Sequence, residues 1–256
     1  MRVGTVYRQV FFNFVQAERL KMRLKTIFML PLKPESKISR MNFVNLHTHH
    51  ASDDHSVTAI VNQYPDDDFA GESVYSVGIH PWYVKRDTLT RELQIVEDRL
   101  KDPKCIAVGE CGLDRKVEIP WDLQMKAFEH QLIIAEEFQK SVVLHCVGAY
   151  SDLAAMHKHM KLTVPLIIHG FSKNLGTAKQ MLDHDIYLSF GKHLMRNPNL
   201  KEVFLSVPDD KFFLETDSAE ETIQQVYEKA AEYKQMNIDD LKQLVWQNYE
   251  RVFVKK

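Results

Sequence analysis

From residue 41 onward, short runs of β-branched and apolar residues alternate with longer segments of helical periodicity. Such alternation is typical of βα units, in which parallel strands form the core. The pattern predicts eight strands, over residues 43–46, 57–62, 74–79, 105–109, 142–144, 166–168, 186–190 and 212–215.

Helical periodicity is clearest in the second half of the chain. Apolar residues recur every three or four positions over residues 121–138, as one buried helix face requires, and the same spacing recurs over residues 89–100. Ser218 and Glu221 have the spacing of a capping box before a further helix. Asn237 is the expected N-cap of the last helix.

Eight strands that alternate with helices predict an α/β fold, a (β/α)8 TIM barrel. The first three strand candidates follow one another too closely for full helices between them. We therefore expect a barrel trimmed of one or two early outer helices, with loops in their place.

The charge is unevenly distributed and separates a leader from the expected barrel. Residues 1–40 carry nine basic and two acidic side chains, whereas the other 216 residues carry 24 basic and 33 acidic ones. Met41 stands immediately before the first predicted strand. We predict that residues 1–40 are a basic N-terminal extension outside the fold and that residues 41–256 form the barrel.

The composition favours a cytoplasmic protein. The three cysteines (Cys105, Cys111 and Cys146) include no Cys-x-x-Cys pair, so neither a disulfide framework nor a zinc ribbon is predicted. No apolar run approaches the roughly 18 to 20 residues that a bilayer span needs, and we expect no membrane partner. The sequence carries no signal for a particular oligomeric state.

Imidazoles and carboxylates stand at the C-terminal ends of five predicted strands. In a parallel barrel these ends meet at one mouth. Their nitrogen and oxygen atoms suit Zn, Mn, Fe, Ni or Mg ions, and a central carboxylate can bridge two ions about 3.5 to 4 Å apart. The pattern predicts a metal site, with two ions as a hypothesis. Its residues are His47, His49, Glu110, His145, His169 and Asp217.

The motifs around these residues resemble the TatD family of metal-dependent hydrolases, within the amidohydrolase-like barrels. The similar segments keep the family's order from residue 42 to residue 253, and Gly-Glu-Cys-Gly-Leu-Asp and Glu-Thr-Asp are the most specific. They are His47-Thr48-His49, Gly78-Ile79-His80-Pro81, Val108-Gly109-Glu110-Cys111-Gly112-Leu113-Asp114, Val143-Leu144-His145-Cys146, Ile168-His169-Gly170-Phe171-Ser172, Glu215-Thr216-Asp217-Ser218 and Asn248-x-x-Arg251-x-Phe253.

The resemblance implies a (β/α)8 barrel with two divalent ions, with Mg, Mn or Zn foremost. It assigns the first ion to His47, His49, Glu110 and Asp217, and the second to the bridging Glu110, His145 and His169.

The resemblance also implies a reaction. Water activated by the two ions would attack a phosphodiester bond while Asp217 accepts a proton, and His80 would contact the substrate. Members of the family are commonly deoxyribonucleases that often act from a 3′ end, so DNA is the expected substrate.

Three departures from the family pattern keep other functions open. Asn45 replaces the Asp of Asp-x-His-x-His, a carboxylate that would orient a ligand imidazole. Val147 stands where many nuclease members have an Arg that grips phosphate. Ala219 leads directly into a helix in place of Pro and a long substrate loop. The alternatives are a hydrolase of a small ester, amide or phosphoester and a non-catalytic metal-binding barrel.

Further residues are expected near the mouth. Lys173, Lys192 and Arg115 stand in predicted loops there and could supply positive charge, and His193 is a further candidate for substrate contact. The opening Leu46-His47-Thr48-His49, followed by Ser52-Asp53-Asp54, also resembles polymerase-and-histidinol-phosphatase barrels. That similarity ends after the first strand.

Overall fold

The computed structural model describes residues 41–68 and 73–254. The predicted basic extension, residues 1–40, lies outside the described residues. Among the helices of the described ranges, none has both the length and the apolar character that a membrane span requires.

Eight parallel strands form one sheet in which each strand pairs with the next along the chain. The last strand returns to the first through a bridge between Thr48 and Asp217, so the sheet curls into a nearly closed barrel and the predicted fold is confirmed. The strands are β1 (Phe43–Thr48), β2 (Val57–Gln63), β3 (Tyr75–Val77), β4 (Cys105–Asp114), β5 (Ser141–Val147), β6 (Leu166–Ile168), β7 (Tyr187–Phe190) and β8 (Phe212–Leu214).

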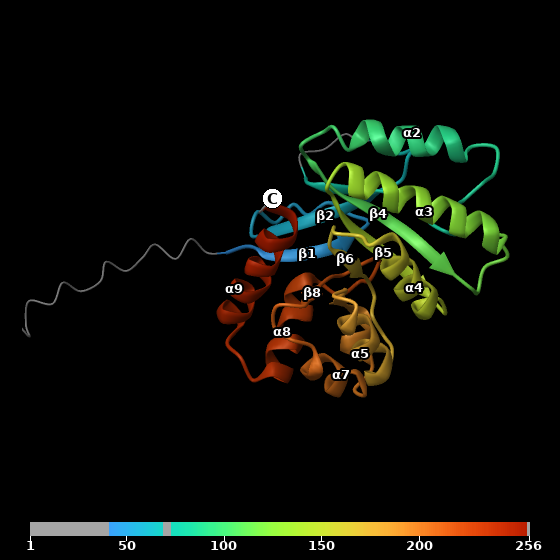
Figure 1. The fold of residues 1–256 in the computed structure, drawn as a ribbon. Coiled ribbons are helices and arrows are strands. Elements are labelled where there is room, and N and C mark those ends of the chain that lie inside the picture. The colour runs from blue at the N-terminus through green and yellow to red at the C-terminus, as the bar shows by residue number, and fades with distance from the viewer. Residues whose placement is uncertain (1–40, 69–72, 255–256) are drawn as a thin grey trace, which may run out of the picture. The chain divides into compact units, whose positions relative to one another are not determined.

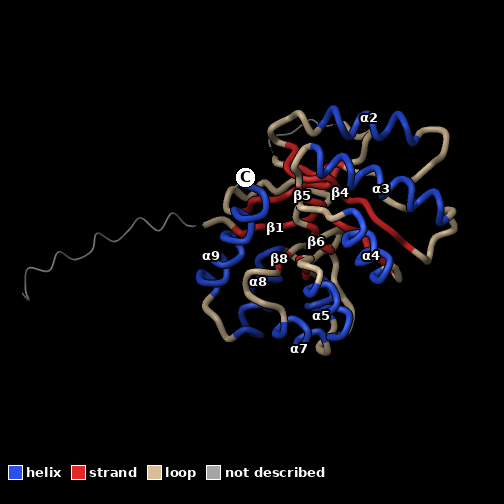
Figure 2. The backbone as a smooth tube through the Cα atoms, viewed as in Figure 1, coloured by secondary structure: helices blue, strands red, loops and turns tan. Residues whose placement is uncertain are grey.

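Helices surround the strands, as Figures 1 and 2 show. Within the described residues no helix lies between β1 and β2 or between β2 and β3, which agrees with the expected trimmed barrel. The helices are α2 (Leu89–Arg99), α3 (Trp121–Glu137), α4 (Tyr150–Met160), α5 (Leu175–Asp183), α6 (Lys192–Arg196), α7 (Leu200–Ser206), α8 (Ile223–Lys234) and α9 (Ile238–Tyr249), followed by a π-helical turn, η1 (Glu250–Val254).

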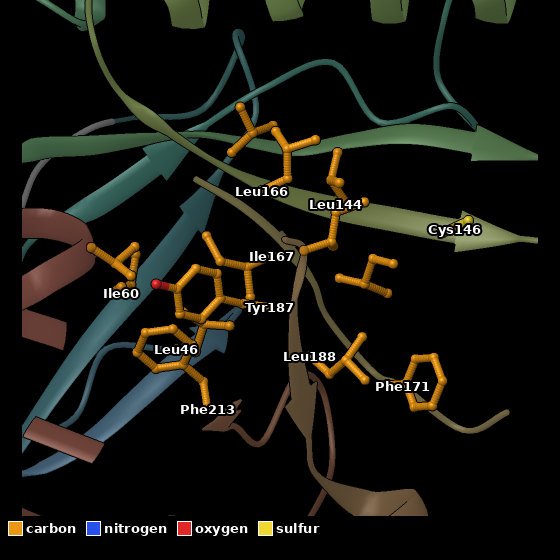
Figure 3. Packing of buried hydrophobic residues seen from close by; sticks show 14 of the residues in the cluster. Leu46, Ile60, Leu144, Cys146, Leu166, Ile167, Phe171, Tyr187, Leu188 and Phe213 are labelled. Atoms are coloured by element: carbon orange, nitrogen blue, oxygen red, sulfur yellow. The ribbon is translucent and has the colours of Figure 1, made fainter. Parts of the chain in front are cut away.

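The core consists of apolar side chains that the strands direct toward one another. Figure 3 shows Leu46, Ile60, Ile167 and Tyr187, from β1, β2, β6 and β7, gathered in one cluster. Burying one such aliphatic side chain contributes about 1.5 to 3 kcal/mol, so strands contributed by distant parts of the chain are held in fixed positions.

Strand β4 is longer than predicted. It continues to Asp114 instead of ending at Gly109, because Gly112–Asp114 go on pairing with β5. Glu110 therefore lies within a strand and not after one. The register between β4 and β5 shifts between Val108 and Cys111, immediately around Glu110.

The predicted cap of the helix after β8 is wrong. Thr222 is the N-cap of α8 and forms a capping box with Gln225. Glu221 instead accepts hydrogen bonds from the guanidinium of Arg196, at 2.7 Å from Nε, and this ion pair engages the carboxylate that a box at Ser218 would need. Asn237 caps α9 as predicted.

Candidate metal centre

The buried carboxylate of Glu110 lies at the centre of a cluster of imidazoles. Its Oε1 atom is 2.7 Å from His169 Nε2, 2.9 Å from His145 Nδ1 and 3.1 Å from His80 Nε2. Its Oε2 atom is 3.3 Å from His47 Nε2 and 4.0 Å from His49 Nε2. Side chains from β1, β4, β5 and the segments after β3 and β6 thus meet around one carboxylate.

Asp217 completes the cluster from the segment after β8. Its Oδ1 atom lies 3.4 Å from His49 Nε2 and 3.8 Å from His47 Nε2, whereas its Oδ2 atom accepts a hydrogen bond from Lys192 at 2.8 Å. The structure therefore brings together all six metal ligands predicted from the sequence, with His80 beside them.

The carboxylates of the cluster place negative charge next to imidazole nitrogens, and this shifts the pKa values of both kinds of group. Burial opposes ionisation of Glu110, but the surrounding imidazoles, His169 first, outweigh burial and hold the pKa of this carboxyl well below its usual range. Burial likewise lowers the pKa of His169, but Glu110 and Glu215 outweigh it and hold this pKa well above its usual value. Carboxylates that stay ionised and stabilise positive charge on a neighbouring imidazole also attract a metal cation.

Two acidic side chains behind the cluster orient its imidazoles. Asp114 Oδ2 lies 3.1 Å from His145 Nε2 and can accept the hydrogen of this nitrogen, which would free the Nδ1 lone pair for an ion between His145 and Glu110. Glu215, which is buried, places Oε1 3.4 Å from His169 Nδ1 and leaves Nε2 facing Glu110. Metal-binding histidines typically donate their other N–H to a carboxylate in this way.

His80 is oriented in the opposite sense. Its Nδ1 atom accepts a hydrogen bond from the backbone N–H of Trp82 at 3.1 Å, so its Nε2 atom carries the hydrogen and donates to Glu110. Burial, the largest influence, lowers the pKa of His80 and favours the neutral ring. Although His80, Glu110 and His145 lie close enough to form a ligand group, His80 has no lone pair free for an ion.

Unpaired buried atoms show that the residues fit divalent cations. Neither ring nitrogen of His47 has a well-aligned hydrogen-bond partner, and His169 Nδ1 and Glu215 Oε2 also lack one. Ligand atoms of His47, His49 and Glu110 lie within 4.8 Å of one another. Buried polar atoms are seldom left unpaired, and the unpaired Nε2 of His47, which faces Glu110 and Asp217, fits a cation between this nitrogen and the carboxylates.

Asn45 does not replace the missing carboxylate. Its side chain donates to Thr216 Oγ1 at 2.8 Å and accepts from the Thr216 backbone N–H at 3.0 Å, which joins β1 to the end of β8. Its hydrogen bonds go to Thr216 and not to an imidazole.

Three buried amides support the cluster and were missed from the sequence. Asn62 Oδ1 accepts from the Glu110 backbone N–H at 2.6 Å. Gln124 accepts from the Asp114 N–H at 2.9 Å, and Gln131 accepts from the Ile79 N–H at 2.7 Å.

A sequence signal for the two glutamines exists. Gln124 and Gln131 are seven residues apart, two turns of α3, and both lie on its buried face. A polar residue repeated within an apolar stripe needs a specific partner, because burying an unpaired amide is costly.

The cluster opens into a hollow of about 510 Å³. Lys173, Lys192 and His193 line this catalytic hollow, as the sequence suggested, and so does Val147. Arg115 is not among the lining residues, because it pairs with Asp152 at 2.8 Å and lies over the Trp121 ring.

Comparisons with known proteins agree with this geometry. The sequence model of a family described as TatD related DNase matches residues 33–254. An uncharacterized metal-dependent hydrolase of Haemophilus influenzae is 26% identical over 207 residues, which are 72% of this chain and 79% of the relative. A Rahnella protein named 3′-5′ ssDNA/RNA exonuclease TatD is 31% identical over 159 residues, 56% of each chain.

Solved structures show the same fold. YjjV, a TatD homologue from Escherichia coli K12, has a TM-score of 0.72 and 22% identity, over 84% of this chain and 98% of that chain. A TatD-family hydrolase of Entamoeba histolytica has a TM-score of 0.71 and 14% identity, over 84% of this chain and 99% of that one. Because the family match spans most of the sequence, this chain belongs to the TatD-related DNase family and is a metal-dependent hydrolase.

Proposed function

We propose that this protein is a nuclease that hydrolyses phosphodiester bonds of single-stranded nucleic acid from the 3′ end, using two divalent ions. The observation that carries the proposal is the buried Glu110 carboxylate, which faces imidazoles on both of its oxygens at the floor of an open hollow. Relatives named 3′-5′ ssDNA/RNA exonuclease support the choice of substrate.

The ligand residues divide into two groups that share Glu110. His47, His49 and Asp217 would hold one ion, and His145 and His169 would hold the other, with Mg, Mn or Zn as the metals that suit these donors. When bound, such ions lower the pKa of water and offset charge that develops on the phosphoryl oxygens.

The remaining chemistry belongs to side chains of the chain itself. Asp217 lines the catalytic hollow, and its carboxylate would accept the proton that the attacking water loses. Lys192, 2.8 Å from this oxygen, would pair with the phosphate once the carboxylate is protonated. His80, a hydrogen-bond donor to Glu110, would hold that carboxylate in place and contact the substrate at the wall of the catalytic hollow.

A cleavage assay tests the proposal. The full chain is incubated with a labelled single-stranded oligonucleotide and Mg²⁺ or Mn²⁺, and product lengths show the direction of attack. We expect stepwise shortening from the 3′ end. Glu110→Ala is the control for contaminating nucleases, because it removes the shared ligand and should abolish both cleavage and metal binding.

His80→Ala separates substrate contact from metal binding. Since His80 donates to Glu110 and has no free lone pair, this variant should retain its ions by elemental analysis while losing activity. Equal metal loss in His80→Ala and Glu110→Ala would contradict the role given to His80.

A second candidate function rests on Val147. This apolar side chain lines the catalytic hollow where an Arg would grip phosphate, which favours a smaller ester, amide or phosphoester. A protein that binds two ions, cleaves no oligonucleotide and hydrolyses small esters would favour this alternative. A cytoplasmic location is part of the proposal, since the three cysteines are buried and unbonded.

A further inference from the structure

Three aromatic side chains form a ridge beside the metal centre. Tyr64 follows β2, and Trp82 and Tyr83 follow β3. Trp82 is 50% exposed and Tyr83 is 52% exposed, and no other aromatic side chain within the described ranges is exposed to this degree. Large aromatic surfaces left in water beside a catalytic hollow are typical of ligand contacts.

The ridge separates two hollows. Tyr64, Trp82 and Tyr83 line the catalytic hollow and also a second hollow of about 310 Å³. The lining of the second hollow combines the apolar Ile79, Val84 and Ile119 with charged side chains, which are Asp66, Lys85 and Glu92. A ligand that leaves the metal centre in this direction must therefore pass over exposed aromatic rings.

The rings are held in place before any ligand binds. The indole N–H of Trp82 donates to Asp114 Oδ2 at 2.7 Å, and its ring stands edge-on to His80 with centroids 5.0 Å apart. Tyr83 packs edge-on against Tyr64 with centroids 5.4 Å apart. Because the rings are already ordered, stacking on them costs little conformational entropy.

The lysines of the catalytic hollow complement this apolar ridge. Lys173 and Lys192 also line that hollow and supply positive charge near the metal centre. Fixed aromatic rings together with ammonium groups match a ligand that has flat apolar bases along one edge and phosphates along the other. Proteins that bind single-stranded nucleic acid combine these two features.

We propose that Trp82 and Tyr83 form a base-stacking platform that selects an unpaired strand end, with the terminal base stacked on these rings while its phosphate enters the metal centre. The proposal rests on the nuclease function proposed above. Bases in a duplex are already stacked and paired, so their faces cannot reach the platform unless the end frays. The platform thus gives a physical reason for preferring single strands.

The test compares strands with and without terminal bases. Oligothymidylate of about ten nucleotides is compared with the same strand carrying abasic residues at its 3′ end. For the native chain, loss of the bases should raise KM about tenfold or more, since about tenfold is within the usual worth of a single stacked base. In Trp82→Ala and Tyr83→Ala, KM for the normal strand should rise by a similar factor while KM for the abasic strand stays nearly constant.

Two further variants sharpen the comparison. Trp82→Phe keeps an aromatic face but loses the bond to Asp114, so it should retain most of the discrimination between the two strands. Ile133→Ala removes a 42% exposed apolar side chain on α3, outside both hollows, and should behave as the native chain does. Bound metal, measured on each variant, should be unchanged. If Trp82→Ala and Tyr83→Ala discriminate between the strands as the native chain does, the platform is refuted.

A binding measurement separates this proposal from the nuclease function. Fluorescence anisotropy of the labelled strands reports binding even if no strand is cleaved. Binding that requires both the terminal bases and Trp82, without cleavage, would support the platform and refute the nuclease. Cleavage with equal affinity for both strands would refute the platform alone, and the absence of binding and cleavage would refute both.

Discussion

Replacing Gln131 with Met tests whether α3 fixes the exit of β3. Gln131 is fully buried, and its Oε1 accepts from the Ile79 N–H at 2.7 Å while its Nε2 donates to the Ile79 carbonyl at 3.2 Å. Methionine occupies a similar volume but makes neither bond. Ile79 immediately precedes His80, so the substitution acts directly beside the metal centre.

The expected cost follows from the two groups that the substitution leaves unpaired. A buried N–H or carbonyl without a partner costs about 1 to 3 kcal/mol, and the added apolar contact of methionine offsets part of this, which gives a loss of about 2 to 4 kcal/mol. In a protein of this size 1 kcal/mol lowers the melting temperature by roughly 2 to 4 °C. We therefore expect a decrease of about 5 to 15 °C.

Calorimetry of the purified variant measures this decrease. Gln243→Met, at an exposed position of α9, is the matched control and should melt with the native chain. Bound metal should persist below the transition, because the proposed ligand set does not include His80. A Gln131→Met protein that melts within about 2 °C of the native chain would show that this amide does not hold the strand exit.

Three other perturbations have defined outcomes. Gly109→Ala should lose more than about 3 kcal/mol in a denaturant titration, because Gly109 has a φ of 142° and an added Cβ would lie 2.4 Å from a β5 carbonyl oxygen. Gly176→Ala is the control and should lose little, because an added Cβ there would make only an ordinary contact, 3.5 Å from Asn174 Oδ1. Partial burial opposes ionisation of Glu136, but hydrogen bonds from Thr163 outweigh it and lower the pKa of Glu136. This contribution to stability is present above the ordinary pKa of 4.5 and is lost as the pH falls through the lower folded value. The difference in melting temperature between the native chain and Glu136→Gln should therefore shrink in acid, and a constant difference would contradict this assignment. Deletion of residues 1–40 should leave the melting temperature unchanged, since the described residues, 41–68 and 73–254, contain all eight paired strands and a buried core. A large decrease would show that the extension packs on the barrel.

Local pattern was enough to predict the architecture and the side chains that gather around Glu110. Apolar runs of three to six residues, separated by segments of helical period, predict strands and helices because each element must bury one face. His47, His145 and Asp217 could be identified because parallel strands of one barrel deliver the residues at their ends to one side. Neither the prediction of the elements nor that of the residues at the strand ends requires knowledge of which strands are neighbours in the sheet.

At the start of α8 the sequence contains two possible capping motifs, and the sequence alone does not show which of them caps the helix. Both Ser218-x-x-Glu221 and Thr222-x-x-Gln225 have capping-box spacing. The structure uses the second, because Glu221 is engaged by Arg196, 25 residues away in the chain. A distant charge thus decides the start of α8.

The roles of individual atoms are decided only by the tertiary structure. Asp114 and Glu215 contact the ring nitrogens of His145 and His169 that point away from Glu110, whereas at His80 the N–H of Trp82 occupies the Nδ1 lone pair and leaves the Nε2 hydrogen for Glu110. Local sequence rules identify imidazoles but not the ring nitrogen that keeps a lone pair, since this depends on hydrogen-bond partners that several different strands supply. The residue types along the strands are therefore enough to predict a metal site, whereas the packing of eight strands around Glu110 determines which of these residues can bind an ion.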